Sequence, residues 1–475
     1  MSDPTPIRLE TLLGQLPPEW PDDVLPTIRA EAAALGRVVV ALDDDPTGTQ
    51  TVHGIDVLTE WSVSSLVEVL QSHPRAFYIL TNSRALPTPE AVALAQAIGA
   101  NLAQAACQTG RDVCVISRSD STLRGHYPAE VDAVEAALAA GLGVTFHGQV
   151  IAPFFYDGGR LTAGDVHYVR EGDTLVPAAQ TEFARDAAFG YRASNLRDWV
   201  AEKTGDRVTA SAVRSISLDD IRQGGPDRVA EEFTQAPVDA VTIVNAMSER
   251  DIEVAALGAL RAEAAGRRFV YRTAASFVRA RAGIPRRGLL TAQELVGGSA
   301  GRGGLVVVGS YIQKSSAQLT HLLALPQVVG VELSVADILA GQAEAASARA
   351  AQAANDALER GQVPVVYTSR GLVTGANAEA SLGIGHAISE ALIQVVRSIQ
   401  HGPRFVVAKG GITSSDTATQ GLGIRRAHVL GQILPGVPVW QAGAESRWPG
   451  VPYIVFPGNV GGPEAMATVV GMLSA

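Results

Sequence analysis

The chain is poor in the features that mark several specialised classes of protein. Only two of its 475 residues are cysteine, and no run of 18 apolar residues occurs anywhere in it. Two cysteines are too few for a zinc knuckle or a disulfide framework, so Cys107 and Cys114 are expected to be buried, reduced thiols. A membrane-spanning helix is excluded because it needs a longer apolar run, and no secretory signal is evident at the N-terminus. We therefore expect a globular, cytoplasmic protein with no membrane partner.

The chain also lacks an excess of positive charge. It has 38 lysines and arginines against 48 aspartates and glutamates, a net charge of −10. Binding to DNA or RNA requires a basic surface, so nucleic acid is not an expected partner. A nucleotide such as ATP stays compatible with this balance, because backbone amides and Mg²⁺ can bind its phosphates.

A repeated pattern of short apolar runs, polar or glycine-rich turns and alanine-rich stretches predicts the secondary structure. Runs that are apolar throughout suit strands buried on both faces of a parallel sheet. The helical stretches between them predict βαβ units. The expected strands are Arg37–Leu42, Ala76–Leu80, Asp112–Ile116, Leu305–Val308, Pro364–Tyr367, Phe405–Ala408 and Tyr453–Phe456, and the expected helices are Pro89–Gln108, Pro128–Ala140, Ser334–Gln362 and Ala376–Gln400.

The length of the chain exceeds what one hydrophobic core usually organises. We predict an α/β protein with two lobes, each a mainly parallel sheet flanked by helices, and a ligand cleft between them. Residues 1–35 form an N-terminal extension, 36–285 the first lobe and 300–475 the second, with a connection rich in glycine and arginine at 279–304. Residues 153–186 lack clear periodicity and are expected to form either a lid over a cleft or an ordered surface arm.

The turns of the first lobe carry charged and hydroxyl side chains at strand ends, where open parallel sheets bind ligands. Asp43, Asp44 and Asp45 are consecutive, and their mutual repulsion calls for a cation, Mg²⁺ or hydroxyl groups nearby. A solvated acidic turn is the alternative. Arg84 and Arg124 follow two further strands and suit a carboxylate, although either could instead form a surface ion pair. Together these turns predict a site for a small polyhydroxy acid.

The turns of the second lobe are rich in glycine instead. They are 309–316, 409–416 and 457–463. Glycine allows close approach of the backbone, and N–H groups at the start of a helix favour phosphate, whereas the hydroxyl residues could simply cap helices. No Walker A motif and no dinucleotide fingerprint is present. His126 and His167, each next to a tyrosine, are expected to be structural hydrogen-bonding residues.

Taken in order, these turns resemble the motifs of the four-carbon acid sugar kinase family, once known as domain of unknown function 1537. The resemblance extends from about Val38 to the C-terminus. The motifs that carry it are Asp44-Asp45-Pro46-Thr47-Gly48, Thr81-Asn82-Ser83-Arg84, Asp120-Ser121-Thr122-Leu123-Arg124-Gly125, Gly309-Ser310, Gly410-Gly411-Ile412-Thr413 and Pro457-Gly458-Asn459-Val460-Gly461. Pro46 replaces the usual aromatic residue, and His126 follows the third motif where an asparagine-led turn is typical.

The resemblance implies that residues 36–285 bind a sugar acid and residues 300–475 bind a nucleotide. It also implies ATP-dependent phosphorylation of a hydroxyl of a small acid, such as threonate, erythronate or an oxo derivative. The residues that it assigns to the substrate are Asp44, Asp45, Arg84, Asp120, Ser121, Thr122, Leu123 and Arg124, and those that it assigns to ATP are Ser310, Gly410, Gly411, Ile412, Thr413 and Gly458.

The mechanistic hypothesis is in-line transfer of the γ-phosphoryl group, with Mg²⁺ bridging the phosphates. Asp45 or Asp44 would accept the hydroxyl proton, and Arg84 or Arg124 would anchor the carboxylate. The metal ligands on the protein are unknown, and a homodimer is left open. The alternatives are a non-catalytic sensor that binds both ligands and a sugar-acid dehydrogenase, against which the missing dinucleotide fingerprint speaks.

Overall fold

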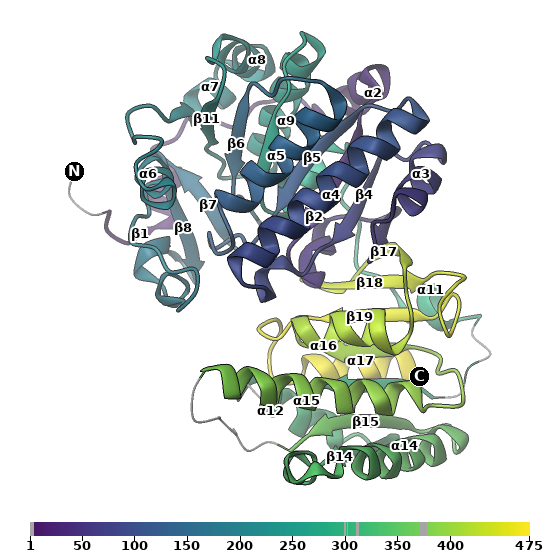
Figure 1. The fold of residues 1–475 in the computed structure, drawn as a ribbon. Helices are drawn as coiled ribbons and strands as arrows, with labels where there is room; N and C mark the ends of the chain where they lie inside the picture. The colour runs from purple at the N-terminus through teal and green to yellow at the C-terminus, as the bar shows by residue number, and fades with distance from the viewer. Residues whose placement is uncertain (1–3, 299–300, 302, 310–312, 370–377) are drawn as a thin grey trace. The chain divides into compact units, whose positions relative to one another are not determined.

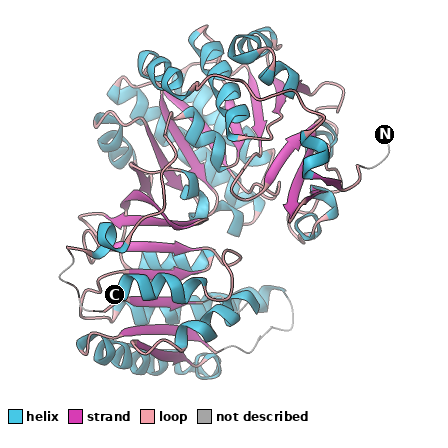
Figure 2. Cartoon of the chain, turned by 180° about the vertical axis from the view of Figure 1, so that it is seen from behind, coloured by secondary structure: helices cyan, strands magenta, loops and turns pink. Residues whose placement is uncertain are grey.

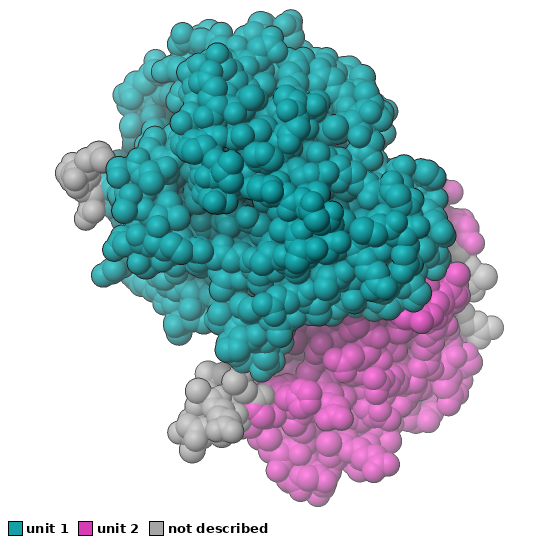
Figure 3. Space-filling model, turned by 45° about the horizontal axis from the view of Figure 1, so that its top comes forward, with its two compact units in different colours: residues 1–286 teal, residues 287–475 magenta. Residues whose placement is uncertain are grey.

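The computed structural model describes residues 4–298, 301, 303–309, 313–369 and 378–475. The chain divides into two compact units, Met1–Arg286 (unit 1) and Arg287–Ala475 (unit 2), which Figure 3 colours separately. In both units a mainly parallel sheet is flanked by helices, as Figures 1 and 2 show. The predicted fold class is therefore confirmed.

Unit 1 is built on a parallel sheet in the order β10-β11-β6-β12-β5-β2-β4-β3. In that order the strands are Arg214–Ile216, Ala240–Val244, Gly148–Ala152, Val270–Thr273, Val113–Arg118, Val38–Asp43, Ala76–Leu80 and Ile55–Leu58. Every residue of β2, β4 and β5 is buried, which explains why these strands are apolar on both faces. The three strands expected in this part of the sequence end within two residues of the observed positions.

Helices cover both faces of this sheet (Figure 1). They include α2 (Leu25–Leu35), α3 (Val63–Gln71), α4 (Thr88–Thr109), α5 (Ala129–Leu142), α9 (Glu249–Ala264) and α10 (Ala275–Arg281). The buried faces of α4 and α5 are rich in alanine, including Ala95, Ala103 and Ala133, and small side chains allow the two helices to pack closely against each other and the sheet. The helices α4 and α5 confirm the two expected at 89–108 and 128–140.

A second, antiparallel sheet in unit 1 has the order β1-β9-β8-β7. Its strands are Ile7–Arg8, Thr174–Pro177, Val166–Glu171 and Arg160–Ala163. The strands β7 and β8 are joined by Gly164 and Asp165 with φ of 56° and 65°, the backbone that a two-residue hairpin turn requires. The segment 153–186 is thus an ordered small sheet, completed by a strand from the N-terminal residues.

Unit 2 has a sheet in the order β17-β18-β19-β16-β13-β15-β14, antiparallel at the β17–β18–β19 end and parallel elsewhere. The strands are Arg426–Leu434, Val437–Ala442, Pro452–Phe456, Val406–Lys409, Leu305–Val308, Val363–Thr368 and Val328–Leu333. The principal helices are α12 (Gln313–Leu323), α14 (Ala343–Glu359), α15 (Ala378–Arg397), α16 (Gly411–Asp416) and α17 (Ala465–Ser474).

Two of the expectations from sequence are wrong. The continuous helix expected over 334–362 is divided into α13 (Val335–Asp337), a π-helical turn at Ile338–Gln342 and α14, because Gly341 adopts a left-handed backbone with φ of 78°. Cys107 is exposed rather than buried, whereas Cys114 is buried as expected. Within the described ranges, no helix has both the length and the apolar character needed to cross a membrane.

Candidate functional site

The polar turns of unit 1 meet at one edge of its sheet. The strands β2, β4 and β5 are adjacent and parallel, and Asp43 at the end of β2 is in register with Leu80 of β4 and Arg118 of β5. Because the three strands end at the same level, the segments that follow them are neighbours. These segments include the short helices η1 (Pro46–Thr51) and η2 (Ser83–Ala85), which begin directly beyond the strand ends.

Arg84 links the first two of these segments by binding Asp44 with two hydrogen bonds. Its Nη2 donates to Asp44 Oδ1 at 2.6 Å and its Nε donates to Oδ2 at 3.1 Å. The Asp44 side chain is only 3% exposed and Arg84 19% exposed. Both carboxylate oxygens of Asp44 are therefore engaged in a paired hydrogen bond with Arg84 at a buried position.

Asp45 is placed differently from Asp44. Its Oδ1 accepts from the backbone N–H of Thr47 at 2.9 Å and from the Thr47 hydroxyl at 2.5 Å. Its Oδ2 lies 3.8 Å from Arg84 Nη1, and the side chain is 24% exposed. Burial alone would raise the pKa of Asp45, but Arg84 and the Thr47 hydrogen bonds outweigh it and hold the pKa below its usual range. Asp45 is therefore an ionised carboxylate that is more exposed than Asp44.

Asp43 pairs with Arg118, whose Nη1 lies 2.9 Å from Asp43 Oδ1. Burial, with the nearby charges of Asp44 and Asp45, raises the pKa of Asp43 to about 7, although Arg118 opposes this. The charge of the acidic run is thus compensated by two guanidinium groups, and the solvated acidic turn weighed as an alternative is wrong. The Cα of Gly48 approaches Asp43 so closely that a Cβ there would lie 2.0 Å from Asp43 Oδ2.

The turn after β5 forms a third part of the same charge network. Arg124 Nε donates to Asp120 Oδ2 at 2.7 Å, and the Thr122 hydroxyl donates to the same oxygen. Burial would raise the pKa of Asp120, but Arg84 and Arg124 lower it well below its usual range. Arg84 donates hydrogen bonds to Asp44, lies 3.8 Å from Asp45 and lowers the pKa of Asp120. These groups therefore form one cluster. The Leu123 side chain is buried in the hydrophobic core, so only its backbone could meet a ligand.

Two buried histidines hold the backbone of these turns in place. His167 Nε2 is 2.8 Å from the carbonyl of Ser121, and His126 Nε2 is 3.0 Å from the carbonyl of Ser83. Burial lowers the pKa of His167 to about 4, so its ring is neutral at physiological pH. These contacts agree with the structural role expected for both histidines.

The small sheet of unit 1 adds residues that sequence analysis did not select. The guanidinium groups of Arg124 and Arg160 lie 5.2 Å and 5.4 Å from the centre of the Phe183 ring. Asp186 Oδ2 is 3.5 Å from Arg124 Nη1. Burial is the main reason that the pKa of Arg160 is lowered, and its Nε has no hydrogen-bond partner among the described residues. Arg160, whose Nη1 donates to the Gly158 carbonyl, is therefore a cation beside the cluster with no ion pair among the described residues.

Two further buried groups border the cluster from other elements. Arg272, at the end of β12, donates from Nη2 to the Arg124 carbonyl at 2.9 Å. Glu130, on α5, accepts a 2.6 Å hydrogen bond from the Ser83 hydroxyl, and burial raises its pKa to about 7. Neither residue stands in a polar turn, so the pattern used on the sequence could not select them.

In unit 2 the glycine-rich turns also come together. The buried Lys409 ends β16 and donates from Nζ to the carbonyls of Pro457 at 2.6 Å and Gly458 at 3.1 Å. Burial and the charge of Lys314 lower its pKa to about 7. Lys314 Nζ donates to the Asn459 carbonyl at 3.0 Å, so two lysines hold the 457–463 turn.

The residues proposed for the nucleotide lie at these turns. Gly410 has a φ of 105° and precedes α16, whose first three residues are Gly411, Ile412 and Thr413. Ile412 is 64% exposed. A Cβ at Gly309 would lie 2.3 Å from the Thr413 hydroxyl, so the end of β13 contacts this turn. Ser310 lies outside the described residues.

No group of three or more histidine, cysteine or acidic side chains that could hold a metal ion occurs in the described part of the chain. The carboxylates of unit 1 are engaged by arginine instead.

Comparison with known proteins assigns a class to each half of the chain. Residues 39–281 match a sugar-binding N-terminal domain, and residues 305–466 match a nucleotide-binding C-terminal domain. The chain belongs to the four-carbon acid sugar kinase family. The resemblance noted in the sequence is thereby confirmed, and the chain is a distant homologue of the kinases in this family.

Individual relatives of this family member are remote. A D-threonate kinase of Salmonella typhimurium is 28% identical over 228 residues, which cover 46% of this chain and 48% of that protein. The chain thus matches about half the length of this curated relative. A Haemophilus influenzae protein of the domain of unknown function 1537 family has a TM-score of 0.62 at 19% identity, covering 91% of this chain and all (100%) of its own.

A second solved structure, a Salmonella typhimurium protein described as a tRNA synthase, has a TM-score of 0.65 at 18% identity and covers 91% of this chain and 98% of its own. At these identities the two structures establish a shared fold and nothing further.

Proposed function

We propose that this protein is an ATP-dependent kinase that phosphorylates a hydroxyl group of a small, four-carbon sugar acid. Unit 1 would bind the acid and unit 2 would bind ATP. The observation that carries the proposal is the cluster of Asp44, Asp45, Arg84, Asp120 and Arg124 at the ends of parallel strands. It lies in the half of the chain that matches a sugar-binding domain.

The cationic side of the cluster supports binding of the acid's carboxylate. Arg124 has two carboxylate neighbours, Asp120 and Asp186, whereas Arg160 forms no ion pair among the described residues. Both guanidinium groups lie over Phe183, whose ring gives one wall of low polarity. We assign the carboxylate to Arg160 together with Arg124, because a planar guanidinium suits paired hydrogen bonds to a carboxylate.

The acidic side of the cluster supports binding and activation of a hydroxyl. Asp44 has both oxygens bound by Arg84, whereas Asp45 keeps Oδ2 at 3.8 Å from the same arginine and is more exposed. Asp45 is therefore the better acceptor for the substrate hydroxyl proton, and Asp44 holds Arg84 in place. General-base assistance of this kind contributes about 10²–10⁴-fold to a rate.

The converging turns of unit 2 support the assignment of ATP binding to this unit. Lys409 and Lys314 fix the carbonyls of 457–459, and Gly410 allows the backbone to approach a phosphate closely. Mg²⁺ would bridge the phosphates and neutralise the charge that develops during transfer. The glycines and Thr413, together with Gly458, are the residues that we propose for contact with the nucleotide.

The experiment is an ATP-consumption assay with a panel of threonate, erythronate and 3-oxo-tetronate, followed by the same assay on Asp45→Asn. We expect turnover with at least one acid and a fall in kcat of at least 100-fold in the variant. Asp173→Asn is the matched control, since Asp173 is 82% exposed on the small sheet and carries the same charge. Unchanged turnover in Asp45→Asn would refute the role of Asp45.

Binding of ATP and an acid without turnover across the whole panel would instead support the non-catalytic sensor. The homodimer remains a prediction, which sedimentation velocity of the purified chain would test.

A further inference from the structure

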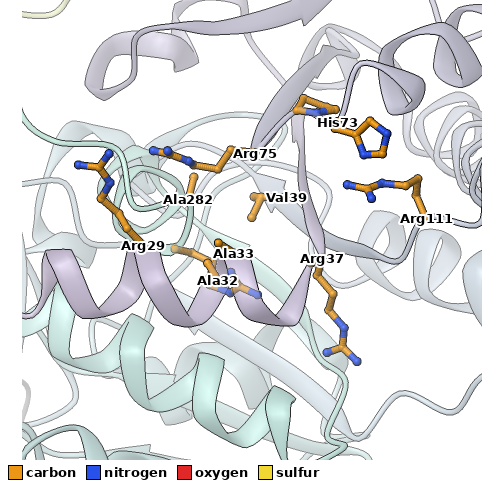
Figure 4. A pocket seen from close by; sticks show the side chains of 12 residues that line it. Arg29, Ala32, Ala33, Arg37, Val39, His73, Arg75, Arg111 and Ala282 are labelled. Carbon is orange, nitrogen blue, oxygen red and sulfur yellow. The ribbon is translucent and has the colours of Figure 1, made fainter.

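Unit 1 contains a cavity of about 310 Å³ at the edge of the sheet opposite the charge cluster. Its lining includes Arg29, Arg37, Arg75, Arg111 and Arg281, and also His73 (Figure 4). The volume falls within the range of small-molecule sites, which begins at about 300 Å³. The lining contains no acidic side chain.

The position of these arginines follows from the topology of the sheet. Arg37 directly precedes β2, Arg75 directly precedes β4, and Arg111 lies two residues before β5. These three adjacent parallel strands bring their amino ends together in the same way that they bring together the cluster at their carboxyl ends. With β2 six residues long, the two sites are separated by roughly 17 Å at about 3.3 Å per residue.

Most of the positive charge in this cavity has no acidic partner. Arg37 pairs with Asp112 and Glu263, and Arg281 pairs with Glu263. Arg29, Arg75 and Arg111 form no ion pair among the described residues. Figure 4 shows the Arg37 side chain pointing away from Arg75. Three arginines of the lining, of which Arg29 and Arg75 are exposed and Arg111 is half-buried, therefore have no ion pair among the described residues.

The Nη1 of Arg281 and the Nε of Arg111 have no hydrogen-bond partner among the described residues, but both atoms are inaccessible to solvent, so neither of them faces the cavity. Arg75 forms one hydrogen bond, from Nη1 to the Gly283 carbonyl at 3.2 Å.

The carboxyl ends of nearby helices provide a simpler explanation for part of the charge. The helix α2 ends at Leu35 beside the cavity, and Ala32, Ala33 and Gly36 line it. Carbonyl groups at the end of a helix attract cations. That attraction explains one favourable contact but not the gathering of five arginines in one lining.

We propose that this cavity is a second ligand site, distinct from the charge cluster, for a small anion with two or more negative charges, such as a phosphate-bearing metabolite. Arg29, Arg75 and Arg111 would bind its oxygens directly. Burial is the main cause that lowers the pKa of Arg75, and the charge of Arg29 is the second. A bound anion would therefore relieve the repulsion between Arg29 and Arg75. The inference does not depend on the proposed kinase activity.

Arginine-specific labelling with phenylglyoxal, read by peptide mass spectrometry, tests this at single residues. The probe is inorganic pyrophosphate, added to the full chain at an ionic strength held constant with NaCl. We expect pyrophosphate to slow modification of Arg75 and Arg111 at least fivefold. Arg170, exposed on the small sheet, should react at an unchanged rate. Because the readout is resolved by residue, pyrophosphate bound at the nucleotide turns cannot imitate the result.

Variants make the test reciprocal. In Arg75→Gln the protection of Arg111 should be lost, and in Arg111→Gln the protection of Arg75 should be lost, while both persist in Arg170→Gln. Having two variants guards against misfolding of either one, which circular dichroism would reveal. Equal labelling rates with and without pyrophosphate would overturn the proposal. Equal protection by the monovalent anion acetate would overturn the preference for a multiply charged ligand.

Discussion

Replacing Arg84 with methionine should destabilise unit 1 locally, because the buried Asp44 would lose both hydrogen bonds from Arg84, leaving Arg118 Nη1 at 4.0 Å from its Oδ1. The Asp44 side chain is 3% exposed, and each of its carboxylate oxygens accepts a hydrogen bond from Arg84, at 2.6 Å and 3.1 Å. Breaking a buried pair on one side costs about 3–5 kcal/mol. Arg84 is 19% exposed, so we expect the lower end, about 3 kcal/mol.

The measurement is native-state hydrogen exchange of peptides that cover β2 and β4, which reports their opening free energy separately from unit 2. A loss of about 3 kcal/mol corresponds to exchange roughly 100-fold faster. In the double variant Arg84→Met with Asp44→Asn, the negative charge of Asp44 is removed as well. This should restore part of the lost stability, so that the double variant is more stable than the single one.

A matched control is Arg207→Met. Arg207 Nη2 lies 2.6 Å from Asp132 Oδ2, the same distance as in the buried pair, but these side chains are 57% and 33% exposed. An exposed pair is worth about 0–1 kcal/mol. If Arg84→Met changes exchange no more than Arg207→Met does, or if adding Asp44→Asn destabilises further, the argument from buried charge is wrong.

Three further predictions concern other parts of the two sites. Gly48→Ala should cost unit 1 about 2 kcal/mol, because the new Cβ would lie 2.0 Å from the buried Asp43 carboxylate; unchanged exchange of β2 would contradict this. The pKa of Glu130 is raised to about 7, so its folded form binds a proton more tightly than its unfolded form. This contribution to stability is complete below pH 4.5 and falls by about 3 kcal/mol as the pH rises to 7. Glu130→Gln should flatten that part of the curve of unfolding free energy against pH, and an unaltered curve would refute the assignment. Lys409→Met should raise the KM for ATP at least tenfold with little change in the KM for the acid, because the Gly458 carbonyl loses its donor; equal changes in both KM values would show a general loss of structure instead.

Local sequence patterns were sufficient for most of the fold. The runs at β2, β4 and β5 are apolar up to the polar residues at the carboxyl ends of β2 and β5, because both faces of each strand are covered, and that requirement is visible in the sequence itself. The single expected helix over 334–362 was wrong because the left-handed backbone of Gly341 interrupts it. Glycine tolerates helical and left-handed backbones alike, so its identity alone does not reveal which it adopts.

The sequence by itself determined which turns carry the charged and glycine-rich motifs, because those residues follow directly after recognisable strands. Only the tertiary structure decided how the charges pair. The assignment of Arg84 to Asp44 and of Arg118 to Asp43 depends on the order of parallel strands in the sheet. Arg160 and Glu130 reach the cluster from a separate sheet and from the face of a helix. Contacts between residues this far apart in the chain leave no local periodicity, and the same is true of the arginines that gather at the opposite ends of the strands.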